Sequence, residues 1–144
     1  MRLLRACQAA KYCRENNLTT LGIGLGMQVM AIEVARNILG LADANSYEMD
    51  DQTKNRIVDI MEDLKSVGNP FGTMRRGGYD TVIAKDTKAY SIYGAEKVTE
   101  RHYHRYELNV EYRDQLVEAG LACTGVHPDS GLVDIVEFPA NDWY

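Results

Sequence analysis

Apolar positions recur with a helical period in two early segments of the chain. Over residues 3–16 and again over 27–39 the apolar side chains are spaced three to four residues apart, which predicts two helices, each with an apolar face. The short apolar run over 18–25 has the length and composition of a buried parallel strand. The order helix, strand, glycine-rich turn and helix favours an α/β fold.

The second half of the chain contains shorter apolar runs that are separated by turn residues. Strands or extended segments are expected over residues 56–61, 73–78, 81–84 and 106–109. Helices are expected over residues 86–95 and 110–119. Loops are expected over residues 42–55 and 68–72. Runs over 122–126 and 132–138 flank the turn His127-Pro-Asp-Ser-Gly, a pattern typical of a hairpin. We therefore expect a mainly parallel sheet with flanking helices and a C-terminal hairpin.

Composition narrows the class of protein without identifying it. A chain of 144 residues with 45% apolar content forms one domain at most. Its 16 Lys and Arg against 21 Asp and Glu leave a net charge of -5, which argues against a nucleic-acid partner. No apolar run is long enough for a membrane span. Three cysteines without metal-type clustering indicate reduced thiols in a cytoplasmic protein, with no metal site.

The segment Leu21-Gly-Ile-Gly-Leu-Gly-Met-Gln is the most informative part of the chain. A nucleophile elbow is a sharp strand-to-helix turn that requires small residues two places before and two places after its corner. Gly22 and Gly26 occupy those places around Gly24, which itself carries no nucleophile. The spacing fits neither a Walker loop nor a dinucleotide fingerprint. On spacing alone a plain tight turn remains an alternative to an elbow.

The elbow segment resembles class I glutamine amidotransferases, whose pattern is Gly-x-Cys-x-Gly-x-Gln. A longer match is to the amidotransferase domain of CTP synthases, and it includes the motifs Gly-Thr-Met-Arg and His-Arg-Tyr-Glu. The matching stretches are residues 21–28, 35–48, 72–75, 101–109 and 119–139. The resemblance covers nearly the whole chain and implies a partial class I amidotransferase domain of flavodoxin-like fold over residues 1–144.

The resemblance also implies a function, with partners and cofactors. In this family a thiol releases ammonia from glutamine, and a synthetase domain uses the ammonia to convert ATP-activated UTP to CTP. The implied partners are glutamine and the synthetase domain or subunits of CTP synthase. ATP and Mg²⁺, with GTP as activator, belong to the parent enzyme, and no cofactor is expected in this chain.

Site residues follow from the resemblance position by position. Gly24 stands where the nucleophilic Cys is expected, and the backbone N–H of Leu25 matches an oxyanion donor. Gln28 matches a glutamine contact, Glu48 the carboxylate for the α-ammonium group, and Arg105 the guanidinium for the α-carboxylate. Taken singly, Gln28 would be interpreted as a polar residue at a helix N-terminus, Glu48 as a solvated loop charge and Arg105 as a surface residue.

Two further residues complete the implied set. Tyr106 lies beside the predicted carboxylate-binding arginine. Arg75 belongs to the Gly-Thr-Met-Arg stretch, which resembles a region implicated in activation by GTP. Both assignments rest on the motif match alone.

Departures from the family pattern change the expected activity. Gly24 removes the thiol, and Tyr103 replaces a second arginine. The family's upstream oxyanion loop and its downstream His-Pro-Glu would fall before residue 1 and after Tyr144. His127-Pro128-Asp129 imitates the latter, but it sits in a predicted hairpin turn. We therefore expect an incomplete, catalytically incompetent glutaminase domain with exposed strand edges; a non-catalytic glutamine-binding or assembly module is the alternative.

Overall fold

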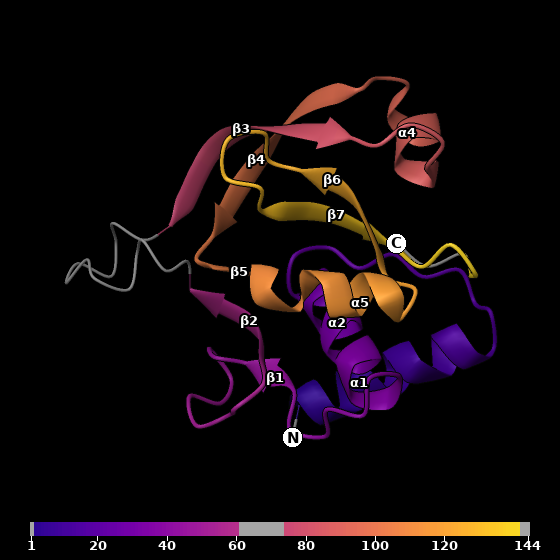
Figure 1. The fold of residues 1–144 in the computed structure, drawn as a ribbon, viewed down its shortest axis with the longest axis vertical. Coiled ribbons are helices and arrows are strands. Elements are labelled where there is room, and N and C mark those ends of the chain that lie inside the picture. The colour runs from indigo at the N-terminus through magenta and orange to yellow at the C-terminus, as the bar shows by residue number, and fades with distance from the viewer. Residues whose placement is uncertain (1, 61–73, 142–144) are drawn as a thin grey trace.

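The computed structural model describes residues 2–60 and 74–141. In this part of the chain a small sheet and two long helices lie beneath a larger, curled sheet (Figure 1). The helices are α1 (Arg2–Glu15), α2 (Leu25–Asn37), α4 (Lys88–Tyr93), the 3₁₀ turn η1 (Val110–Tyr112) and α5 (Arg113–Glu118). The strands are β1 (Asn45–Ser46), β2 (Arg56–Ile60), β3 (Arg75–Ile83), β4 (Lys97–His104), β5 (Tyr106–Leu108), β6 (Ala122–Val126) and β7 (Val133–Glu137).

The strands form two sheets that are mostly antiparallel. The small sheet has the order β1-β2-β5, and only its β1–β2 pair is parallel. The larger sheet has the order β4-β3-β6-β7 with every pair antiparallel. The chain passes from one sheet to the other at Arg105, the bend between β4 and β5.

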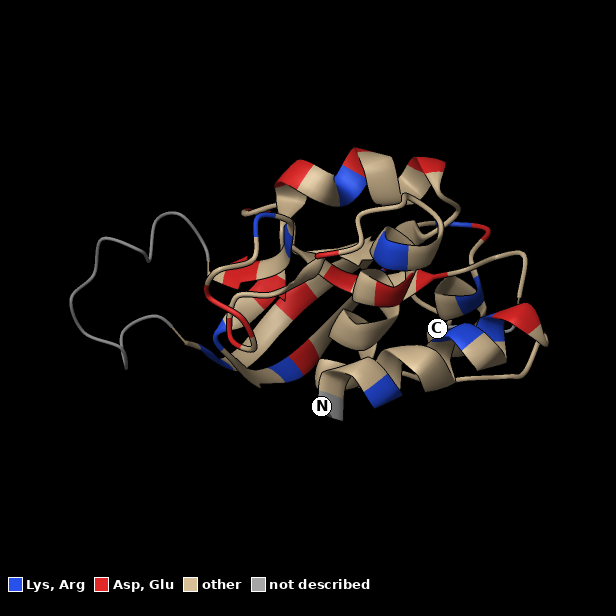
Figure 2. Ribbon diagram, turned by 90° about the horizontal axis from the view of Figure 1, so that it is seen from below, with Lys and Arg blue, Asp and Glu red and all other residues tan. Residues whose placement is uncertain are grey.

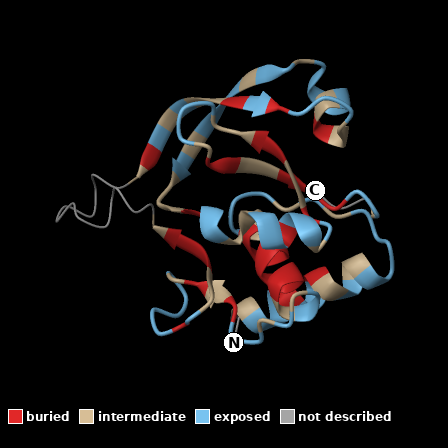
Figure 3. Ribbon diagram, viewed as in Figure 1, coloured by how far each residue is buried: buried red, intermediate tan, exposed pale blue. Residues whose placement is uncertain are grey.

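Helix α2 forms the centre of the hydrophobic core. Its residues Gln28 to Ala35 are all buried, so the helix is enclosed on every side rather than on one apolar face (Figure 3). It packs against α1, the small sheet and α5. The buried apolar residues around it include Cys7, Ala10, Ile57, Val58, Leu108, Leu116, Val133 and Val136. This burial fixes the start of α2, and with it the glycine-rich turn, relative to the rest of the domain.

The prediction of a mainly parallel sheet is wrong for the described residues, and so is the strand predicted over 18–25. That segment has irregular backbone with a single bridge residue, Thr20. Its apolar side chains are open to solvent, with Leu21 67% and Ile23 79% exposed. A parallel strand forms only when neighbouring strands accept and donate its backbone hydrogen bonds. Among the described residues, this single bridge is the only strand-type pairing that the segment makes.

Most other elements confirm the sequence-based predictions. The two long helices, the strand β2, the helix α4 and the hairpin β6–β7 form where the patterns place them. The extended segments predicted over 73–78 and 81–84 merge into the single strand β3. Two strands were not predicted: β4, and the two-residue β1, which lies inside the loop predicted over 42–55. The loop predicted over 68–72 lies outside the described residues.

Basic and acidic residues are interspersed along the described elements. Figure 2 shows Lys and Arg spread over several helices and strands, with Asp and Glu between them. Among the described residues, no helix is both long and apolar enough to cross a bilayer.

Candidate glutamine-binding site

Gly24 forms the corner at which the chain turns into α2. Its backbone angles, φ 58° and ψ -113°, are ones that residues with side chains adopt only under strain. Gly24 is the N-cap, and its carbonyl accepts a hydrogen bond from the N–H of Gln28 at 3.3 Å. Leu25, the first residue of the helix, has an N–H with no intrahelical acceptor. The turn therefore has the sharp corner of an elbow, with bare main chain at that corner, although irregular backbone rather than a strand leads into it.

Close packing explains one of the two flanking glycines. A Cβ at Gly22 would lie 2.3 Å from the sulfur of Met30 and 2.8 Å from backbone atoms of Gly26 and Met27. A Cβ at Gly26 would meet no heavy atom within 4 Å outside its own helix, and the same holds at Gly24. The packing therefore requires a glycine two places before the corner, at Gly22. It does not require one two places after the corner, at Gly26.

Gly22→Ala is expected to lower the free energy of unfolding by about 1–3 kcal/mol, because backbone atoms cannot yield to the added methyl group as a side chain can. Gly26→Ala is the matched control, and its expected change is within about 0.5 kcal/mol. Urea unfolding followed by circular dichroism measures both values. Equal stabilities of the two variants would show that the turn is not packed as described.

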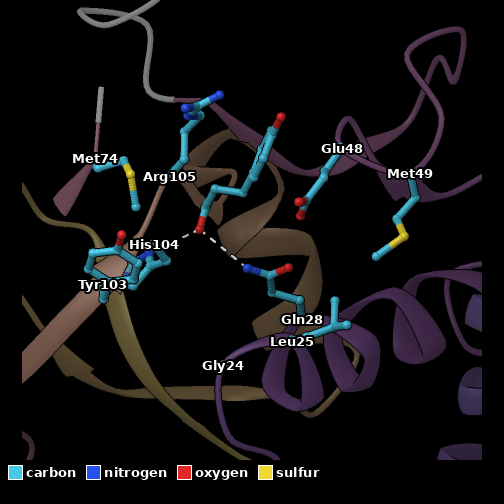
Figure 4. A pocket seen from close by; sticks show the side chains of 10 residues that line it. Gly24, Leu25, Gln28, Glu48, Met49, Met74, Tyr103, His104 and Arg105 are labelled. Carbon is cyan, nitrogen blue, oxygen red and sulfur yellow. Dashed lines mark hydrogen bonds between the residues drawn. The ribbon is translucent and has the colours of Figure 1, made fainter. Parts of the chain in front are cut away.

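A pocket of about 570 Å³ opens beside this corner (Figure 4). Its walls come from the start of α2, the loop after β1 and the junction between β4 and β5. The lining residues are Gly24, Leu25, Gln28, Glu48, Met49, Met74, Tyr103, His104, Arg105 and Tyr106. Six of the seven predicted site residues therefore line one cavity, although they come from three separate parts of the sequence.

Charges of opposite sign stand on different walls of this pocket. Glu48 is exposed, and its N–H donates a hydrogen bond to the buried Ser46 hydroxyl at 3.3 Å. In Figure 4, Arg105 and Gly24 lie on opposite sides of the pocket, and Glu48 lies apart from both of them. Gln28 is buried at 8% exposure and donates from its Nε2 to the carbonyl of Tyr106 at 3.3 Å. This arrangement suits a small zwitterion with a polar tail.

Arg75 is the one predicted residue that does not line the pocket. It is buried at the start of β3, with its Nη1 2.7 Å from Oδ1 of Asp134 on β7 and 3.4 Å from Oε1 of Glu107 on β5. Its guanidinium also lies 4.6 Å from the ring centre of Tyr79. Burial raises the pKa of Glu107 to about 7, although Arg75 opposes that rise. The described contacts of Arg75 are those of a structural ion cluster; its link to GTP stays a prediction.

His104 is a pocket residue that the sequence interpretation did not single out. Its Nδ1 lies 3.2 Å from the carbonyl oxygen of Tyr106, and its Nε2 lies 2.8 Å from Nδ1 of His102. Burial is the main cause that lowers the pKa of both imidazoles. The alternation of a strand places residues 102 and 104 on one face, a signal available once β4 is recognised.

His127 lies where the sequence predicted it, in the turn between β6 and β7. Its Nδ1 is 2.8 Å from the hydroxyl of Ser130, and its ring contacts Tyr79 edge-on at 5.8 Å. It does not line the pocket beside Gly24.

The family model "Glutamine amidotransferase class-I" matches residues 3–141. The chain therefore belongs to the class-I glutamine amidotransferase family.

Within this family the chain is homologous to the glutaminase domain of CTP synthases. It is 57% identical over 136 residues to CTP synthase of Bacteroides fragilis, covering 94% of this chain and 26% of that protein. CTP synthase of Hydrogenobaculum is 47% identical over 137 residues, with 95% and 26% covered. The chain thus spans about a quarter of the length of these curated relatives.

A solved structure is similar to this chain in fold and in sequence. The Trypanosoma brucei CTP synthase glutaminase domain, solved with bound acivicin, superposes with a TM-score of 0.90 at 36% identity. The match covers 99% of this chain and 55% of that one.

Proposed function

We propose that this chain binds L-glutamine in the pocket beside Gly24, as part of a CTP synthase glutaminase domain, and that by itself it does not hydrolyse glutamine. The observation that carries the proposal is the meeting of Gln28, Glu48 and Arg105 in one cavity at the start of α2. A cavity into which a few polar side chains converge is the usual form of a small-molecule binding site.

The charges suggest how glutamine would lie. The carboxylate of Glu48 suits the α-ammonium group, and the planar guanidinium of Arg105 suits the α-carboxylate. The side-chain amide would then extend toward the corner formed by Gly24 and Leu25. There the backbone N–H of Leu25, which has no acceptor within its helix, and the positive end of the α2 dipole would polarise its carbonyl oxygen.

The chemical step needs an atom that this corner lacks. In a thiol-dependent glutaminase, sulfur forms a bond to the amide carbon, ammonia leaves, and water then hydrolyses the thioester. Gly24 offers no side-chain atom for that bond. The sequence contains one His-Pro pair, His127-Pro128, which lies in the β6–β7 turn away from the pocket. We therefore expect binding without turnover.

We propose the wider role from the likeness to CTP synthases. A complete enzyme of this type would pass ammonia to a synthetase domain for the ATP- and Mg²⁺-dependent conversion of UTP to CTP in the cytoplasm, with GTP as activator. The synthetase domain or subunits would be this chain's partners. Among the described residues, no group of three His, Cys, Asp or Glu side chains could hold a metal ion.

Titration calorimetry with glutamine, paired with an ammonia assay, tests the proposal. We expect binding heat, no ammonia above buffer, and at least tenfold weaker binding for Arg105→Ala, because a charge-assisted hydrogen bond is lost. Arg101→Ala is the matched control, since Arg101 is an exposed arginine outside the pocket. Gly24→Cys should also release no ammonia, because the new thiol would need a base to activate it. His104, the histidine that lines the pocket, has both ring nitrogens already hydrogen-bonded.

Thiol-independent ammonia release by the unaltered chain would refute the proposed loss of activity. Absence of heat with glutamine would remove the binding role and leave an assembly module as the remaining candidate. One observation favours that candidate: an apolar groove of about 400 Å³ lies between residues 21–24, α4 and β7.

A further inference from the structure

The carbonyl oxygen of Tyr106 accepts two hydrogen bonds at the wall of the pocket. One comes from Nε2 of Gln28 at 3.3 Å and the other from Nδ1 of His104 at 3.2 Å, as the dashed lines in Figure 4 show. A backbone carbonyl can only accept, so the atoms that face it must carry hydrogen. The carbonyl therefore determines which end of the Gln28 amide faces it.

With its nitrogen held by this carbonyl, Gln28 must present its oxygen elsewhere. Oε1 of Gln28 is buried and has no donor among the described residues. In Figure 4 it is turned to the same side as the carboxylate of Glu48. A buried acceptor without a donor is unfavourable until a ligand supplies an N–H. Two acceptors on one side of a cavity suit an ammonium group.

His104 is itself held in place. Its Nε2 lies 2.8 Å from Nδ1 of His102, and Oε1 of Glu107 lies 3.3 Å from its Nδ1. With both imidazoles neutral, His102 donates to His104 and His104 donates to the carbonyl of Tyr106. Burial, which lowers the pKa of both rings, favours this neutral arrangement.

We propose that His104 is a positioning residue: its Nδ1–H orients the Tyr106 carbonyl, which holds Gln28 with Oε1 toward the ligand, so that the pocket selects α-amino acids with a free ammonium group. This inference rests on the proposed glutamine binding and adds to it a determinant of selectivity. If the amide of Gln28 turned over, its NH₂ group would face the ammonium and the selectivity would fall.

The test compares L-glutamine with glutaramate, which has the same amide and carboxylate but no α-amino group. Calorimetry would measure both ligands on the unaltered chain and on His104→Asn, His104→Leu and His104→Gln. Asn places an N–H donor where Nδ1 of His104 lies, Leu has the same shape as Asn without a donor, and Gln places its amide near the Nε2 position instead. Circular dichroism and thermal unfolding would confirm that each variant is folded.

His104→Asn should bind glutamine within about threefold of the unaltered chain. His104→Leu and His104→Gln should bind it about tenfold more weakly, a loss expected for one hydrogen bond. Glutaramate binding should change little in any variant, so the preference for glutamine should fall.

Unchanged glutamine preference in His104→Leu or His104→Gln would overturn the inference, and so would equal losses in His104→Asn and the other two. If His104→Leu fails to fold, the comparison of Asn with Gln decides. Absence of glutamine binding by the unaltered chain would instead refute the proposed function.

Discussion

Replacing Arg75 with methionine is expected to lower the free energy of unfolding at pH 8 by about 3–5 kcal/mol, because it leaves two buried carboxylates without their cation. Glu107 is 5% exposed and Asp134 has a side-chain exposure of 4%, so neither regains water when the guanidinium is removed. The loss would be a large part of the total stability of a domain, which is about 5–15 kcal/mol. Urea unfolding measures it.

The penalty for Arg75→Met should depend on pH. Burial raises the pKa of Glu107 to about 7 even while Arg75 lowers it, so the folded pKa without Arg75 rises further above the usual 4.5. A carboxyl group with a raised folded pKa loses stabilising free energy as pH rises from its unfolded to its folded pKa. The variant therefore continues to lose stability above pH 7, and its deficit should be larger at pH 8 than at pH 6.

Arg76→Met provides the control for this experiment. Arg76 is the next residue of β3 and is exposed, with its guanidinium 5.6 Å from the ring centre of Tyr103. We expect its effect to stay within about 0.5 kcal/mol. Similar unfolding midpoints for the two variants would contradict the ion cluster as described.

Arg14→Met is expected to lower the free energy of unfolding by about 3–5 kcal/mol, because it too leaves a buried carboxylate, that of Glu33, without its cation. Glu33 lies in the centre of α2 with 0% exposure, and Arg14 donates to both of its carboxylate oxygens at 2.8–3.2 Å. Asn37 alone would then donate a hydrogen bond to Glu33 among the described contacts, at 3.2 Å. Calorimetric unfolding would report the loss as a lower midpoint temperature.

Lys11→Met tests whether any cation on α1 would have this effect. Lys11 lies 3.7 Å from Glu15, and both side chains are about half exposed, at 43% and 51%. An exposed pair of this kind contributes about 0.2–1 kcal/mol at most. A midpoint in Arg14→Met as high as that in Lys11→Met would show that Glu33 finds another partner or takes up a proton.

The elements predicted correctly are those with strong local signals. Helix α4 is capped at its C-terminal end by Gly94, whose φ of 65° is the left-handed conformation that glycine supplies, and at its N-terminal end by Thr87, whose hydroxyl accepts from the N–H of Tyr90. The hairpin follows two apolar runs around a turn. Local sequence determines such features because the atoms that stabilise them are only a few residues apart.

The elements predicted wrongly depend on distant partners. Strand β4 carries mostly polar residues, and its hydrogen bonds with β3 hold it over the whole register from Arg75–His104 to Val82–Lys97. The apolar segment 18–25 is the reverse case, with the composition of a strand but almost no bridge partner among the described residues. Strand formation follows pairing, and a single segment does not reveal its partners.

The sequence by itself determined the family, through motifs, and the glycine at the corner before α2. It also singled out Gln28, Glu48 and Arg105, because a motif preserves the type and order of side chains. Only the tertiary structure decided that these residues share one pocket, that Arg75 is enclosed by carboxylates instead, and that His104 supports the pocket wall. Those facts depend on which strands pair and what the folded chain buries, and both are set by contacts between residues far apart in the sequence.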